Sequence, residues 1–235
     1  MVQSDKAGGT TEKKRGPRLI YDTQKCAFDF VFSLLLSAIL FFPMMAVALI
    51  IVMIDFGNPF YAQERVGQNG KKFAVLKFRS MKKGADNLEA MLSPQQIDEY
   101  RREFKLKDDP RLIGYRKPGD GNKCFGALLR RSSVDELPQI FWNVCVKRNM
   151  SLVGPRPILE RELEEHYTPE EREIFLSAKP GLTGYWQAYA RNSATYETGE
   201  RQRMELYYIE HQSAFLDMKI LLKTVSAVLK MDGAM

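Results

Sequence analysis

Histidine and cysteine are scarce in this chain of 235 residues. The histidines are His166 and His211, and the three cysteines, Cys26, Cys124 and Cys145, lie far apart without a Cys-x-x-Cys pair. The small number and wide spacing of these residues argue against a histidine-based metal site, a zinc site and a Ser-His-Asp triad. It also gives no basis for a disulfide framework, so the composition favours a reducing compartment.

Basic residues outnumber acidic ones. Thirty-five Lys and Arg against 29 Asp and Glu give a formal net charge of +6 and a sequence pI of about 9.1. An anionic partner is therefore expected, whether nucleic acid, anionic lipid or a phosphorylated substrate. Residues 1–18 are polar and have no apolar period, which predicts a disordered basic tail. No small-residue cleavage site follows the next apolar run, so the tail is not a signal peptide.

Charge is absent from one long segment. Phe30 to Ile54 holds 25 residues without Asp, Glu, Lys or Arg, long enough to cross a hydrocarbon core of about 30 Å. Pro43 lies in its middle and predicts a kink, because proline removes a helix hydrogen bond and clashes with the preceding turn. The arms on either side have 13 and 11 residues, each roughly 17–20 Å as helix, so neither arm crosses the core alone.

Both flanks of this segment are basic, whereas a spanning helix carries its Lys and Arg excess on one side. The flanking cations are Lys13, Lys14, Arg15, Arg18 and Lys25 before it, and Arg65, Lys71, Lys72, Lys77, Arg79, Lys82 and Lys83 after it. A helix over residues 19–57 that bends at Pro43 and returns to the same face satisfies both flanks. A kinked single span followed by a translocated domain is the alternative, and it stays open.

A second membrane contact is predicted near the C-terminus, within residues 58–235, which form the predicted cytosolic domain. One stripe of Phe215–Lys230 is apolar and the opposite stripe carries Lys219, Lys223 and Lys230. A basic amphipathic helix suits the lipid interface. Ordinary packing of the same helix on a protein core explains the pattern equally well.

Residues 59–81 are typical of a hairpin. Tyr61–Val66 and Lys72–Met81 are strand-like, and Asn69-Gly70 supplies the positive-φ residues of a tight turn. Strand alternation places Lys77 and Arg79 on one face, where two cations could clamp a phosphate or simply face solvent. With helical patterns elsewhere, the chain is predicted to be a helix-rich α/β mixed fold.

The segment from Arg130 to Gln139 holds the candidate active centre. Ser133 and Glu136 have the spacing of a capping box, which predicts that a helix starts there with Asp135 in its first turn. The helix dipole would then lower the pKa of both carboxylates. Taken alone, this pattern is more typical of a helix cap than of a catalytic pair.

The surroundings of Asp135 and Glu136 favour chemistry. Adjacent carboxylates hold a divalent cation, usually Mg²⁺ when phosphates take part, and an ionised Asp can attack phosphorus. Arg130 precedes the pair closely enough to neutralise phosphate. Arg156, held between two prolines, is a pre-organised bidentate donor to phosphate oxygens.

At these residues the sequence resembles the bacterial sugar transferases, also called polyprenyl-phosphate hexose-1-phosphate transferases or monotopic phosphoglycosyl transferases. The resemblance runs from about Lys25 to Gly233, with the matching pieces in the family's order. Those pieces are Lys25 with Asp29, Pro43, residues 59–67, 77–81, 109–111, 129–130 and 133–139, Asn143-Val144, and residues 150–157 and 179–184.

The resemblance implies a concrete reaction at the cytoplasmic face of the inner membrane. Asp135 would attack the β-phosphorus of a UDP-sugar, release UMP and keep the phosphosugar, which polyprenyl phosphate then takes up. Glu136 and Mg²⁺ would assist, and Arg191 would contact the donor. Such enzymes start exopolysaccharide, capsule, O-antigen or glycoprotein glycan assembly on a re-entrant membrane helix. The resemblance implies no nucleic-acid partner, and a homodimer is compatible with it.

Two other functions stay open on the sequence alone. A non-catalytic membrane tether that binds anionic lipid or nucleic acid explains the charge and the apolar segment, but not Asp135-Glu136 beside Arg130. A transferase with a metal-activated hydroxyl and no covalent intermediate is the second. The sequence does not identify the sugar.

Overall fold

The computed structural model describes residues 15–103, 106–121, 123–190 and 193–229. The first fourteen residues of the predicted tail lie outside this range, and the helix begins at Arg15, inside the predicted tail. In chain order the elements are α1 (Arg15–Ile54), β1 (Phe60–Val66), η1 (Gln68–Gly70), β2 (Lys72–Phe78), α2 (Leu88–Met91), α3 (Pro94–Glu103), α4 (Phe125–Arg131), η2 (Val134–Glu136), η3 (Ile140–Val146), β3 (Ser151–Val153), α5 (Glu160–His166), α6 (Pro169–Leu176), β4 (Gly181–Thr183), α7 (Tyr185–Tyr189), α8 (Glu200–Glu210) and α9 (Ala214–Leu229). The predicted helix-rich α/β class is confirmed.

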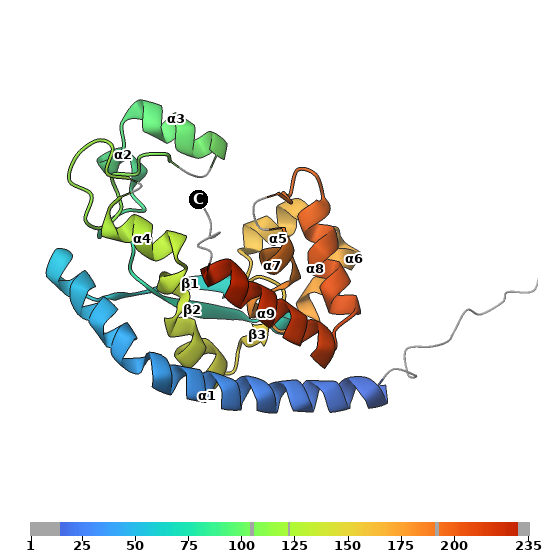
Figure 1. The fold of residues 1–235 in the computed structure, drawn as a ribbon. Coiled ribbons are helices and arrows are strands. Elements are labelled where there is room, and N and C mark those ends of the chain that lie inside the picture. The colour runs from blue at the N-terminus through green and yellow to red at the C-terminus, as the bar shows by residue number, and fades with distance from the viewer. Residues whose placement is uncertain (1–14, 104–105, 122, 191–192, 230–235) are drawn as a thin grey trace, which may run out of the picture.

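Helix α1 runs along one side of the molecule and bends along its length (Figure 1). It is one continuous helix that contains Pro43, so the proline does not interrupt the helix. A kink at Pro43 itself stays a prediction. Within it, Leu19–Ile54 is long and apolar enough to cross a membrane by length and composition. Large apolar side chains along α1 are exposed, among them Leu35, Ile39 and Phe42.

Both ends of α1 are attached to the remaining fold. In the N-terminal half of α1, Asp29 accepts hydrogen bonds from the Ser151 hydroxyl at 2.6 Å and the Leu152 N–H at 3.2 Å. Near its end, Ile51 is fully buried in a cluster with Phe78, Ile113 and Leu129. Because burial of such side chains contributes about 1.5–3 kcal/mol each, the C-terminal end of α1 belongs to a core.

The predicted hairpin is confirmed. Strands β1 and β2 pair antiparallel from Phe60↔Phe78 to Val66↔Lys72. Asn69 has φ 57° and Gly70 φ 73° in the turn, as an Asn-Gly turn requires. Strand β2 ends at Phe78, three residues before the predicted end, because the chain leaves the ladder where Arg79 engages the segment after α1.

The second sheet is a short parallel pair of β3 and β4, with Ser151 opposite Gly181. A Cβ on Gly154 would lie 2.3 Å from the Lys179 carbonyl oxygen, and one on Gly181 would lie 2.1 Å from the Gly154 nitrogen. Only glycine permits this approach of two backbones. The contact fixes the start of the Pro155-Arg156-Pro157 segment against β4.

Helix α9 crosses one face of the molecule above α1, and helices α5 to α8 gather at one end (Figure 1). Ile220 of α9 is fully buried in the main core with Tyr208 and Val153. The other side of α9 exposes Phe215, Met218, Leu222 and Val225. The predicted apolar stripe is therefore exposed, and the face that packs on the core is a different one that includes Ile220. Contact of the exposed stripe with lipid stays a prediction. Residue Lys230 lies beyond the described residues.

Candidate active site

Asp135 and Glu136 lie in η2, a single 3-10 turn between α4 and the π-helical segment η3. The predicted capping box is wrong. Ser133 has φ 57°, in the left-handed region, and its side chain makes no capping hydrogen bond. The reason is that α4 ends at Arg131 with Ser132 as its C-cap, so Ser133 joins two short helical segments and adopts a left-handed conformation between them.

Asp135 is buried, with 8% of its surface exposed. Burial raises the pKa of this carboxyl to about 6, and Glu136 adds to the rise, while Lys77 and Arg130 oppose it. The prediction of a lowered pKa is therefore wrong in sign for Asp135. A three-residue turn aligns too few peptide dipoles to outweigh the loss of hydration.

Glu136 is held by the hairpin. The Lys77 ammonium on β2 donates to its carboxylate at 2.8 Å, and both side chains are about a quarter exposed, 22% and 26%. The charge on Lys77 also acts on Asp135. The structure thus brings the predicted cation Lys77 to both carboxylates.

One buried amide aligns β2 with the site. Asn143 in η3 donates to the Ala74 carbonyl at 2.8 Å and accepts from the Leu76 N–H at 3.0 Å. It therefore ties the free edge of β2 to the segment that follows Asp135 and Glu136. Sequence reasoning assigned Asn143 no role, although a polar residue inside the apolar run Ile140–Val146 was the available signal.

Arg79 points elsewhere. Its guanidinium pairs with the Asp55 carboxylate and the Asp55 carbonyl oxygen, and its Nε donates to the Asn58 carbonyl at 2.8 Å. These contacts fix the segment just after α1. The structure therefore separates Arg79 from Lys77, and a phosphate contact of Arg79 stays a prediction.

Arg130 and Arg156 lie on different elements, and only Arg130 acts directly on Asp135. Arg130 is exposed at the end of α4 and acts on Asp135 through its charge. Arg156 follows β3, and its backbone N–H donates to the Glu205 carboxylate at 3.3 and 3.4 Å. The predicted donor contact Arg191 lies outside the described residues.

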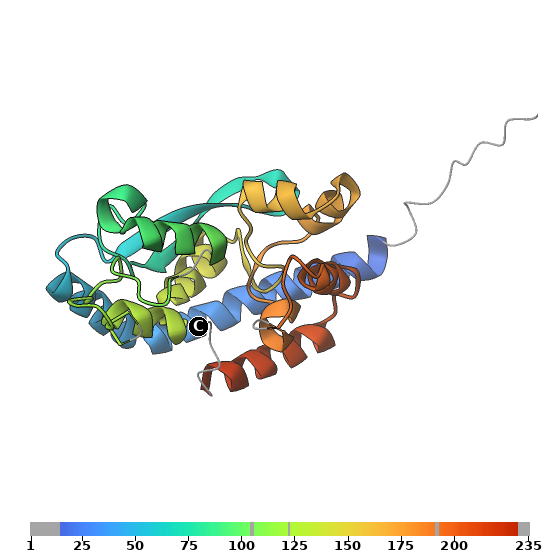
Figure 2. The same cartoon turned by 90° about the horizontal axis from the view of Figure 1, so that it is seen from above.

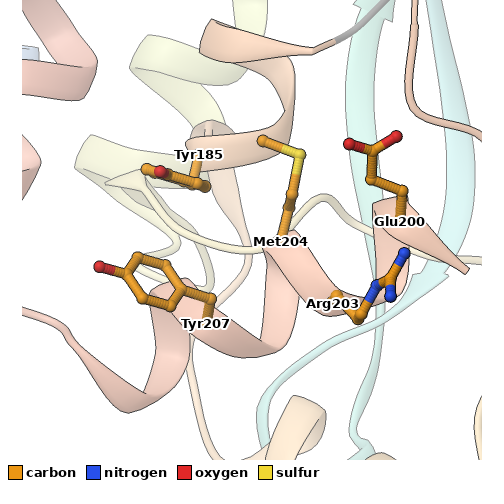
Figure 3. A pocket seen from close by; sticks show the side chains of 5 residues that line it. All are labelled: Tyr185, Glu200, Arg203, Met204 and Tyr207. Atoms are coloured by element: carbon orange, nitrogen blue, oxygen red, sulfur yellow. The ribbon is translucent and has the colours of Figure 1, made fainter.

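A shallow pocket of about 320 Å³ lies apart from this centre, between α7 and α8. Its lining is aromatic and mixed in charge (Figure 3), and consists of Tyr185, Glu200, Arg203, Met204 and Tyr207. None of the predicted site residues belongs to it. The predicted centre at Asp135 is marked instead by a buried carboxyl on which the charges of Lys77 and Arg130 act.

The residues at the centre fit a Mg²⁺ ion that shares its ligands with substrate. The described residues contain no group of three or more His, Cys, Asp and Glu side chains that could hold a metal, so they offer no closed cage. Asp135 and Glu136 are two adjacent carboxylates. Mg²⁺ is commonly bound by one or two carboxylates together with water and substrate phosphates.

Glu205 provides a pH prediction. It is buried with 1% exposed, and burial raises its pKa from 4.5 to about 7 against the opposing effect of Arg201. Because the pKa of Glu205 is higher in the folded than in the unfolded protein, the free energy of unfolding should fall by about 3 kcal/mol as the pH rises from 4.5 to about 7. The variant Glu205→Gln should lose this part of the slope in thermal unfolding between pH 5 and pH 8.

The exposed variant Glu173→Gln on α6 is the matched control and should keep the wild-type slope. An unchanged slope in Glu205→Gln would show that the Glu205 carboxyl titrates at its ordinary pKa.

The fold and this centre define a membrane-associated protein with a buried acidic nucleophile candidate among cations, and the comparison of sequences gives its class. The pattern of the family described as bacterial sugar transferase matches residues 20–231. The chain belongs to this family.

Three relatives show how similar the chain is to other proteins and how much of their length it covers. The chain is 41% identical over 89% of its length to the UDP-galactose-lipid carrier transferase of Erwinia amylovora. It is 38% identical over 94% to the undecaprenyl-phosphate galactose phosphotransferase of Salmonella typhimurium. Only 41% and 43% of those two proteins are covered, so the chain spans less than half of their length. The exopolysaccharide production protein ExoY of Rhizobium meliloti is 36% identical, with 95% of this chain and 93% of ExoY covered.

Proposed function

We propose that the protein transfers a sugar 1-phosphate from a UDP-sugar to a polyprenyl phosphate, such as undecaprenyl phosphate, and releases UMP. The observation that carries the proposal is the buried Asp135 carboxyl beside Glu136, Lys77 and Arg130. The family supports it, and so do relatives named as a UDP-galactose-lipid carrier transferase, an undecaprenyl-phosphate galactose phosphotransferase and an exopolysaccharide production protein.

In the first step, an Asp135 carboxylate oxygen attacks the β-phosphorus of the donor. The bond from this phosphorus to the bridging oxygen breaks, UMP leaves, and an acyl phosphate bearing the sugar forms on Asp135. A pKa of about 6 leaves the carboxyl mostly ionised at neutral pH and makes it a stronger base than an ordinary Asp. Lys77, Arg130 and Arg156 would offset charge that develops on the phosphates.

In the second step, a phosphate oxygen of the lipid attacks the same phosphorus. The bond to Asp135 breaks, the carboxylate is regenerated, and the lipid diphosphate sugar is released. When bound by Asp135 and Glu136, Mg²⁺ would supply positive charge to the donor phosphates. The sugar itself stays open, because the residues assigned to this reaction are directed at the phosphates.

The membrane arrangement is a proposal as well. We propose that α1 is re-entrant and keeps both ends on the cytoplasmic face of the inner membrane. Lys25 near the start of α1 pairs with Asp217, and Ile51 near its end packs on Phe78. Both ends therefore contact the same body of the protein, which disfavours placing one end across the bilayer. Cysteines placed beside Lys25 and Arg65 should react with an impermeant label from the same side, and opposite-side labelling would favour the single span.

The activity is tested with the full chain in detergent micelles. With Mg²⁺, polyprenyl phosphate and a panel of UDP-sugars, at least one donor should yield UMP and lipid diphosphate sugar in equal amounts. The panel also identifies the sugar. If no UDP-sugar is consumed, the non-catalytic membrane tether becomes the better account.

A further inference from the structure

Three arginines from separate elements gather beside the active centre. Arg65 lies near the end of β1, Arg156 follows β3, and Arg201 is in the first turn of α8. The Arg65 side chain is 11% exposed and Arg201 is 8% exposed, so both charges are largely withdrawn from water. We call Arg65, Arg156 and Arg201 the arginine stripe.

Trp186 joins two members of the stripe. The Arg156 guanidinium lies 5.8 Å and the Arg201 guanidinium 4.0 Å from the centroid of its ring. Tyr196 stacks on Arg201 at 3.9 Å. Rings near the guanidinium hold Arg201 in a fixed orientation. Its Nε is buried without a hydrogen-bond partner among the described residues, which leaves a donor unsatisfied.

Arg65 connects the stripe to the catalytic pair. Its Nη2 donates to Gln63 at 2.7 Å, and its ion pair with Glu162 is long, at 3.8 Å. Burial lowers the pKa of Arg65 and Arg156 lowers it further, whereas Glu162 and Glu136 act in the opposite direction. Arg65 therefore lies within the electrostatic reach of both Glu136 and Arg156.

Positive charge is in excess here. The carboxylates that act on the stripe are Glu162, Glu205 and Glu136, and Glu136 is already paired with Lys77. Burial raises the pKa of Glu205 to about 7, so this group is only partly ionised at neutral pH. Buried cations without enough counter-charge are costly unless an anion binds them.

We propose that the arginine stripe binds the phosphate of the leaving nucleotide. The inference rests on the proposed function and orients the donor. The sugar-bearing phosphorus of the donor lies at Asp135, its other phosphate lies against the three arginines of the stripe, and its nucleoside extends toward Trp186. Arginine forks suit phosphate oxygens, which accept two parallel hydrogen bonds. After transfer, UMP occupies the same cations before it leaves.

The phosphate of the lipid acceptor could bind arginines in the same way as the phosphate of UMP, but the position of Arg65 favours the soluble ligand. The β1–β2 hairpin that bears Arg65 and the helix α9 lie on opposite sides of the molecule (Figure 2). The exposed apolar face of α9, with Phe215 and Leu222, marks the side expected to meet lipid. Arg65, the member of the stripe on this hairpin, therefore lies away from the side expected to meet lipid.

The test measures UMP binding to the full chain in detergent micelles by calorimetry. Loss of one charge-assisted contact should raise the Kd of UMP by roughly tenfold or more in Arg65→Gln and in Arg201→Gln. Arg65→Lys keeps the charge but not the fork and should fall between Arg65→Gln and wild type. Arg161→Gln, an exposed cation on the neighbouring α5, is the matched control and should bind UMP normally.

Unchanged UMP affinity in a folded Arg65→Gln protein, with a circular dichroism spectrum like that of the wild type, would overturn the inference. So would a variant that keeps UMP affinity but loses retention of polyprenyl phosphate, because the stripe would then serve the lipid. The proposed function is tested separately. Without Mg²⁺, Asp135→Asn should bind UMP like the wild type. If the wild-type protein binds UMP through the stripe but transfers no sugar phosphate, only the proposed reaction is rejected.

Discussion

Replacing Asp135 with Asn is expected to reduce formation of lipid diphosphate sugar at least about a thousandfold, because an amide cannot attack phosphorus as a carboxylate does. Because Asp135 is buried, a water molecule cannot easily replace its carboxylate as the nucleophile. The two side chains are similar in volume, so the protein should fold, and UMP release from the donor should fall in parallel.

The control for this prediction is Asp86→Asn, an exposed carboxylate between β2 and α2. It should leave the rate within about twofold of wild type, as surface changes away from a site usually do. Release of UMP at the full rate by Asp135→Asn would favour direct attack by the acceptor, without a covalent intermediate.

The second large effect is expected at Asp217, where α9 binds the start of α1. Its carboxylate accepts from Lys25 at 2.6 Å, Tyr21 at 2.8 Å and Tyr208 at 2.7 Å. The side chains of Lys25 and Asp217 are 14% and 12% exposed. Asp217→Ala should lower the free energy of unfolding by about 3–5 kcal/mol, because it leaves a buried ammonium uncompensated.

Thermal unfolding in detergent checks this, and a fall in Tm of about 10 °C is expected for a protein of this size. The double variant Lys25→Met, Asp217→Leu should recover part of the loss, since it removes both charges. Ser226→Ala, exposed on the same helix, is the control. A loss below about 1 kcal/mol for Asp217→Ala would show that the pair contributes no more than a surface ion pair.

Local signals predicted the hairpin well and the catalytic turn poorly. The Asn69-Gly70 turn specifies its own geometry, so β1 and β2 follow from a few residues. The spacing of Ser133 and Glu136 suits a capping box, but it carries no information on the helix that ends just before it. The left-handed Ser133 is a consequence of that junction.

Other parts of the site depend on contacts between distant segments. Asp217 and Lys25 are 192 positions apart, and Asn143 reaches a strand 67 to 69 positions before it. Neither contact leaves a pattern within one window of sequence. The pKa of Asp135 depends in the same way on burial by the folded chain, which the prediction from the helix dipole did not include.

The covalent step on Asp135 is the central claim, and intact mass measurement after incubation with the UDP-sugar donor and Mg²⁺, but no lipid acceptor, tests it most directly. The account predicts that wild-type protein gains the mass of one sugar phosphate, located to the peptide that contains Asp135, and that Asp135→Asn gains none. Release of UMP without any gain in protein mass, or a gain located to another residue, would contradict it.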